Sequence, residues 1–414
     1  MADLTVGRFV IILRSVTLKS EFTDSSRVLT GRIRFQRRIC DVEFFTQFCV
    51  STRIPMITRL LLFLFAVALI APASHCVAQP ISSAMIKVPY KGKDYVGQPL
   101  VWDGTDVVLK RRDGRISRLP ATDLNSMEVV EDKYIPYQSD EMVSKLRVEF
   151  GSKYQVSPTK NFIVVHPPGS SQKWAQPFQD LYYRFRIFFK GRGVELEEPQ
   201  APLVAIVLRT RKEYDRFIKD YQPGLGYSAG YYSPRSNRII TYDRSDQGDW
   251  LNSNDTIVHE ATHQTAYNTG IHARFANAPR WLTEGLAQLF EAKGINNSRY
   301  YGQLSDRINK GALRELMELY RKEEVAGVME QLVQSDSLFR TDVNRSYAIS
   351  WGMSLFLSES YPKKYVAYLA HDGGREPFRG NTRSQRAKDF AKFFGTNFTN
   401  LEARMKSFFE DLKE

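Results

Sequence analysis

The stretch IVHEATHQTAYNTG, residues 257–270, contains the pattern H-E-x-x-H, with histidines at His259 and His263. On an α-helix, residues four apart lie on the same face, so this spacing places the two imidazoles side by side. Polar residues that commonly cap helices precede the first apolar position, and Gly270 is well placed to end the helix. We therefore predict a helix over 254–268 that presents both histidines to one metal ion.

A third protein ligand is expected, because two histidines alone hold a divalent metal weakly. The metzincin spacing would require a histidine at the position of Thr269, so that option fails. His272 lies beyond the helix stop and should point elsewhere. The stretch PRWLTEGLAQLFE, residues 279–291, predicts a second helix that carries Glu284 among apolar residues. A buried carboxylate is costly unless it is paired or metal-bound, so Glu284 is the candidate third ligand.

The residues around Glu284 add two expectations. Gly285 lowers helix propensity by about 1 kcal/mol relative to alanine, and close approach of another helix would explain it. The alternative is that Glu284 is a surface glutamate beside an incidental glycine. Gln288, one turn further on, is positioned to accept a hydrogen bond from the second ring N–H of a ligand histidine, a partner that such histidines need.

The H-E-x-x-H pattern followed by Glu284 within WLTEGLA resembles the gluzincin metallopeptidases. The W-L-x-E-G-x-A stretch is especially similar to the M1-type aminopeptidase pattern, and residues 145–360 resemble an uncharacterised bacterial family of secreted, peptidase-MA-like proteins. The resemblance implies a zincin-like catalytic domain in which the two histidines and Glu284 bind Zn²⁺. It also implies that Glu260 acts as the general base in peptide-bond hydrolysis.

A further group is needed to stabilise the oxyanion, and gluzincins often use a Tyr or His from a later helix. Tyr347, in NRSYAISWGMSLFL, is the first candidate, because a helix that begins there can face the metal. The alternative is that Tyr347 is an ordinary half-buried tyrosine, and Tyr231 and Tyr232 compete for the role. Their segment, residues 230–243, predicts a hairpin, and by analogy one of its strands lies at a sheet edge that can pair with an extended peptide. Two interpretations of Arg238 are open, contact with a substrate carboxylate or a structural salt bridge, and the salt bridge is favoured.

The remaining pattern predicts an α+β protein. Residues 79–133 contain short strands and Gly-containing turns, which predict a small β-barrel-like module with some similarity to SLA1-homology (SH3-like) domains. The resemblance implies that residues 142–302 form the zincin-like catalytic domain, with a small mixed sheet, an edge hairpin and the active-site helices. Its run PLVAIVL is typical of a central strand. Residues 303–414 are predicted to be helical and to complete the cleft.

The N-terminal part predicts export. The run LLLFLFAVALI, residues 60–70, is too short to span a bilayer, which needs about 20 apolar residues. With Arg59 before it and Ala78 after it, this run has the layout of a signal peptide over 56–78. Residues 1–55 are then an over-extended start or a leader. The alternative is a genuine N-terminal segment followed by a short membrane anchor.

Composition restricts the function further. All three cysteines precede the predicted cleavage, so the mature chain has no thiolate ligand or disulfide. Residues 1–78 carry ten Lys/Arg and five Asp/Glu, so cleavage lowers the net charge from +12 to +7. No basic run with interleaved aromatics appears, so no nucleic-acid partner is expected. The absence of a stable membrane span is expected after cleavage.

These observations favour an exported zinc metallopeptidase that acts on a peptide or protein substrate. Two alternatives stay open. One is a catalytically silent binding or structural protein that keeps the peptidase fold, and the other is a zinc amidase that acts on cell-wall material. The oligomeric state and the natural substrate are not indicated by the sequence.

Overall fold

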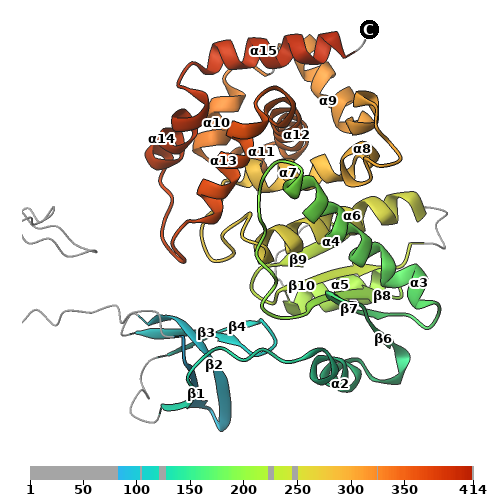
Figure 1. The fold of residues 1–414 in the computed structure, drawn as a ribbon, viewed down its shortest axis with the longest axis vertical. Helices are drawn as coiled ribbons and strands as arrows, with labels where there is room; N and C mark the ends of the chain where they lie inside the picture. The colour runs from blue at the N-terminus through green and yellow to red at the C-terminus, as the bar shows by residue number, and fades with distance from the viewer. Residues whose placement is uncertain are drawn as a thin grey trace, which may run out of the picture. The chain divides into compact units, whose positions relative to one another are not determined.

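The described part of the chain is α+β, as predicted. The structure is a computed structural model that describes residues 83–102, 105–120, 127–221, 228–244, 250–323 and 325–412. It contains two five-stranded sheets and a helical C-terminal part (Figure 1). The predicted leader and signal peptide lie outside the described residues. No helix in the described ranges combines the length and the apolar character needed to cross a membrane.

The first sheet is antiparallel. Its strands are β1 (Met85–Tyr90), β2 (Lys93–Trp102), β3 (Asp106–Arg111), β4 (Ile116–Pro120) and β5 (Glu128–Glu131), in the order β4-β3-β2-β1-β5. The barrel-like closure that the sequence suggested is not found, since no ladder joins β4 to β5 within the described residues. Both edge strands are short, and β5 pairs only with the start of β1, so the sheet stays open.

The second sheet is mixed and carries the candidate site. Its order is β6 (Gln155–Pro158), β7 (Phe162–His166), β8 (Leu203–Leu208), β10 (Arg238–Tyr242) and β9 (Gly230–Ser233). Strands β7, β8 and β10 are parallel, and both outer strands are antiparallel to their neighbours. The run PLVAIVL supplies β8, which is central and fully buried, as predicted. The predicted hairpin is β9–β10, and it leaves β9 at the edge.

Helices cover both faces of this sheet. One face packs against α2 (Ser139–Phe150) and α5 (Arg211–Tyr221), and the other against α4 (Gln176–Lys190) and α6 (Trp250–Asn268). The short helix α3 (Ser171–Trp174) precedes α4. Alternate strand residues point to opposite faces, which gives each face its own apolar cluster. The sequence predicted α6 over 254–268, and the helix begins four residues earlier.

The C-terminal part is helical, as predicted. Its helices are α7 (Arg280–Glu291), α8 (Lys293–Asn296), α9 (Lys310–Arg321), α10 (Val328–Gln334), α11 (Leu338–Thr341), α12 (Val343–Ser360), α13 (Pro362–Gly373), α14 (Arg383–Phe394) and α15 (Phe398–Asp411). Helix α12 is buried over most of its length and packs closely on α7. A Cβ on Gly285 would lie 2.2 Å from Ser354 Oγ and 2.4 Å from the Ser350 carbonyl oxygen. The predicted close helix approach at Gly285 is thus confirmed.

Candidate metal centre

Helix α6 brings the two histidines of the H-E-x-x-H pattern together. The rings of His259 and His263 have centroids 4.8 Å apart, and their Nε2 atoms are separated by 3.2 Å. Ile257, Val258 and Ala261 bury other parts of the helix in the core. The imidazoles keep 15% and 12% of their side-chain surface exposed. The helix is therefore anchored by its apolar residues, while both Nε2 atoms point at one common position near the surface.

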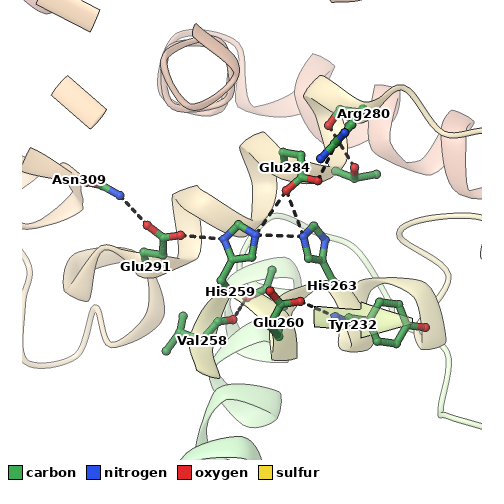
Figure 2. Close-up of polar contacts among 11 residues, drawn as sticks. Tyr232, Val258, His259, Glu260, His263, Arg280, Glu284, Glu291 and Asn309 are labelled. Carbon is green, nitrogen blue, oxygen red and sulfur yellow. Dashed lines mark hydrogen bonds and ion pairs between the residues drawn. The ribbon is translucent and has the colours of Figure 1, made fainter. Parts of the chain in front are cut away.

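Helix α7 supplies a carboxylate to the same position. Glu284 Oε2 lies 3.3 Å from Nε2 of His259 and 3.3 Å from Nε2 of His263 (Figure 2). Only 12% of the Glu284 side chain is exposed, so Glu284 is not the surface residue of the alternative interpretation. Across the described ranges, no other group of three His, Cys, Asp or Glu brings its ligand atoms within this reach.

The three ligand atoms fit a zinc ion. They form a triangle with sides of 3.2, 3.3 and 3.3 Å. Tetrahedral zinc with bonds of about 2.0–2.1 Å requires ligand atoms about 3.3–3.4 Å apart, which is nearly the same spacing. The Glu284 Oε2 atom is buried and accepts no hydrogen bond of normal geometry. A buried oxygen without a donor is costly, and a cation at the centre of the triangle would remove that cost.

Electrostatics keep the Glu284 carboxylate ionised. Burial alone would raise the pKa of Glu284, but its contacts with His263 and His259 outweigh burial and hold the pKa well below the ordinary value. For His259, burial favours the neutral form, yet Glu284 and Glu291 together raise the pKa well above its ordinary value. The centre is therefore a place where positive charge is stabilised, as a divalent cation requires.

A second carboxylate orients His259. Glu291 Oε1 lies 2.7 Å from His259 Nδ1, and its other oxygen accepts a hydrogen bond from Asn309 Nδ2 at 2.6 Å. The prediction that Gln288 fills this role was wrong, since Gln288 Oε1 is buried without a hydrogen-bond partner. A helix turns by about 100° per residue, so position 291 returns to within about 20° of Glu284, whereas position 288 is about 40° away.

Glu260 lies next to the ligands and contacts the edge strand. It is 9% exposed, and its Oε2 accepts a hydrogen bond from the Tyr232 backbone N–H at 2.6 Å. Burial raises the pKa of Glu260, although both neighbouring histidines pull it down. Strand β9 approaches α6 so closely that a Cβ on Gly230 would lie 2.7 Å from Thr256 Cγ2 and 3.0 Å from Glu260 Cγ. Glycine is therefore required where the strand passes the helix.

The three candidate tyrosines differ in position. The Tyr232 hydroxyl donates to Asn237 Oδ1 at 2.9 Å and points away from the ligand triangle, so only its backbone serves the site (Figure 2). Tyr231 packs into the apolar cluster on the opposite face of the sheet. Tyr347, on α12, lies against Glu284 and Arg280. Burial first, and then Glu284, raise the pKa of the Tyr347 phenol. The effect of Glu284 on the Tyr347 pKa places this phenol within electrostatic reach of the ligand carboxylate.

Two other residues lie where the sequence placed them. Arg238 forms hydrogen bonds of 2.6 and 2.9 Å with the Glu149 carboxylate, which is the expected structural pair. His272 follows Gly270, which has a φ of +82°, and takes no part in the ligand triangle. Its nearest charged neighbour is Asp372, with 3.7 Å between Nδ1 and Oδ2.

Arg280 was not singled out by the sequence. Its Nε lies 3.3 Å from Glu284 Oε1, and its guanidinium carbon is 4.7 Å from the centre of the Phe339 ring. The Arg280 side chain stays 42% exposed, so it is accessible to solvent beside the ligand triangle. The available signal was its position four residues before Glu284 on a predicted helix, which places the two side chains on one face.

Fold and site together define an α+β protein with an H-E-x-x-H helix and a glutamate ligand on the next helix. Residues 253–379 match the family described as a protein of unknown function, DUF1570. This match covers the ligand triangle, Glu260, Glu291 and Tyr347. No curated protein matches the chain.

Proposed function

We propose that this protein is an exported zinc metallopeptidase that hydrolyses peptide bonds, with His259, His263 and Glu284 as the zinc ligands. The observation that carries the proposal is the triangle of ligand atoms, which lie 3.2–3.3 Å apart, together with the buried Glu260 on the same helix as the two histidines. When bound, zinc supplies the Lewis acidity that activates a water nucleophile and polarises the substrate carbonyl.

Glu260 is the proposed general base. The Tyr232 backbone N–H donates a hydrogen bond to Glu260 Oε2. Glu260 Oε1 is then left to take a proton from the water nucleophile and to pass it to the leaving amine. Burial raises the pKa of this carboxyl, and a raised pKa makes it a stronger proton acceptor when ionised. The hydrogen bond from β9 also fixes the rotamer of the base, so proton transfer needs little rearrangement.

In this proposal, strand β9 and Tyr347 contact the substrate. Strand β9 is the edge of the mixed sheet and passes directly beside Glu260, so an extended peptide that pairs with it brings its backbone to the site. Tyr347 donates its hydroxyl to the oxyanion that forms from the substrate carbonyl, supported by its position against Glu284 and Arg280.

A peptide-cleavage screen with the mature chain and its Glu260→Gln variant tests the proposal. We expect cleavage by the wild type, a rate about 10²–10⁴-fold lower for the variant, and equal zinc content in both. Glu195→Gln, an exposed change far from the ligands in sequence, is the matched control and should cleave normally. Zinc binding without cleavage of any peptide would favour a silent binding protein, and cleavage of peptidoglycan fragments alone would favour the amidase.

The proposed export of the protein is tested by locating the N-terminus of the mature chain. Residues 56–78 are the proposed signal peptide, so the protein isolated from outside the cytoplasm should begin directly after Ala78. Sequencing of its N-terminus measures this, and an intact N-terminus on a membrane-bound protein would support the anchor instead.

A further inference from the structure

Building on the proposed peptidase function, we propose that Arg280 recognises a side-chain carboxylate of the substrate, on the amino side of the bond that is cleaved. The preferred substrates are then peptides with Asp or Glu at the first or second position before the cleavage site. The inference rests on the surroundings of the Arg280 guanidinium, on its distance from the ligand triangle and on the direction of strand β9.

The Arg280 guanidinium is held in place with part of its surface free. The Phe339 ring lies 4.7 Å below it, and Tyr347 lies beside it, so its plane is fixed. Yet 42% of the side chain is exposed. The guanidinium has five N–H donors in a planar fork, so its contacts with Glu284 and Tyr347 leave donors for the two oxygens of a carboxylate.

The neighbouring acidic groups are already engaged. Glu284 makes one 3.3 Å contact with Arg280 Nε, and its other oxygen belongs to the ligand triangle. Asp336 Oδ1 accepts hydrogen bonds from the Arg280 backbone N–H at 3.0 Å and from the Arg386 side chain at 2.7 Å. It is therefore not a partner of the Arg280 guanidinium. Glu291 is bound to His259 and Asn309 at the far end of α7. Among the described residues, the carboxylate paired with the Arg280 guanidinium is that of Glu284, which Arg280 shares with the ligand triangle.

Arg280 is close enough to reach a residue next to the cleaved bond. Arg280 contacts one oxygen of the Glu284 carboxylate, and the other oxygen of that carboxylate belongs to the ligand triangle. An extended peptide advances about 3.3–3.6 Å per residue. The side chain of the first or second residue from the cleaved bond can therefore contact the guanidinium.

The direction of the elements selects the amino side. Glu291, at the end of α7, meets His259, so Arg280 at the start of α7 lies toward His263 and the end of α6. Strand β9 runs the same way as α6, because Gly230 passes Thr256 whereas the Tyr232 ring stacks 5.7 Å from Tyr267. A peptide antiparallel to β9 runs in the opposite direction, so its amino-side residues lie toward Arg280.

Calorimetry on the Glu260→Gln protein tests recognition without turnover. The probes are acetylated, amidated peptides that carry a single Glu or, in the matched set, Gln at the same position, with and without zinc. We expect about tenfold tighter binding of the Glu peptide, loss of that preference in Glu260→Gln/Arg280→Gln, and a smaller preference in the Arg280→Lys counterpart, which keeps the charge but loses the planar fork. Zinc affinity and melting temperature, measured for each protein, show whether Arg280→Gln has disturbed the ligands or the fold.

Product mapping with the wild type locates the carboxylate. Cleavage should fall one or two bonds after Glu, and Arg280→Gln should abolish the difference of about tenfold in KM between Glu and Gln peptides. Equal binding of Glu and Gln peptides would overturn the inference, as would a preference that survives Arg280→Gln. So would a preference for Glu after the cleaved bond or for a free C-terminus. A Glu preference in binding without any cleavage would instead sink the peptidase proposal and leave the Arg280 contact standing.

Discussion

Two histidine–carboxylate groups lie on either side of Gly270, and they behave differently. His259 and His263 meet Glu284 at 3.3 Å and keep 12–15% of their side chains exposed. His272 and Asp372 are completely buried, 3.7 Å apart, and His272 has no hydrogen bond on either ring nitrogen. Both groups contain the residue types that bind metals. What distinguishes the first is the convergence of three donor atoms on a point that solvent can reach.

The largest expected difference between the two groups comes from removing one histidine from each. His263→Ala should weaken zinc binding by at least about a thousandfold, or about 4 kcal/mol, because only two ligands remain. His272→Ala should leave zinc affinity within about threefold and lower the melting temperature instead, since it opens a cavity in the core. Competition with a chromophoric chelator measures the affinities, and equal losses in the two variants would remove the distinction.

Glu291 orients His259 from outside the ligand triangle, so its replacement should have a smaller effect than loss of a ligand. Glu291→Gln should weaken zinc binding about 10–100-fold, because the remaining amide is a poorer partner for the His259 ring N–H. Gln288→Ala is the matched control on the same helix, and it should leave zinc affinity unchanged because Gln288 has no hydrogen bond to a ligand. The opposite ranking of these two variants would restore the sequence-based assignment of Gln288.

The smallest expected effect concerns pH. Burial, opposed by Asp372, lowers the pKa of His272 below its ordinary value of 6.5. The unfolded chain therefore binds the proton more readily, so His272 costs the protein stability as the pH falls below about 6.5, with a slope of at most about 1.4 kcal/mol per pH unit. In His272→Gln this contribution should vanish, so its unfolding free energy should depend less on pH between about 7 and 5 in urea titrations. A steeper dependence in the variant would contradict the assignment.

Much of the architecture could be predicted because it rests on local patterns. Apolar spacing and a terminal glycine predicted α6, and the apolar run PLVAIVL predicted the central strand. The lone carboxylate at Glu284 in an apolar helix predicted the third member of the cluster, and Gly285 predicted the close contact with another helix. In each case, the signal lies within a few neighbouring residues, where helix and strand periodicity determines which side chains share a face.

The missed features depend on contacts between distant segments. Glu291 reaches His259 only because α7 crosses α6 at a particular angle, and Asn309 joins them from beyond the end of that helix. Arg280 gains its significance from Phe339 and Tyr347, which come from later helices. The openness of the first sheet likewise depends on which strand edges pair. Spacing along one helix or strand carries no information about such crossings.

The contact between Gly285 and α12 bears on how this protein can be divided. Ser350 and Ser354 back the turn of α7 that carries Glu284, so the carboxylate is held from outside the segment that supplies the histidines. A fragment that stops at residue 302 would retain the H-E-x-x-H helix and lose the wall behind its third donor. Truncations, fusions and circular permutants designed to keep the metal centre should therefore leave residues 250–360 unbroken.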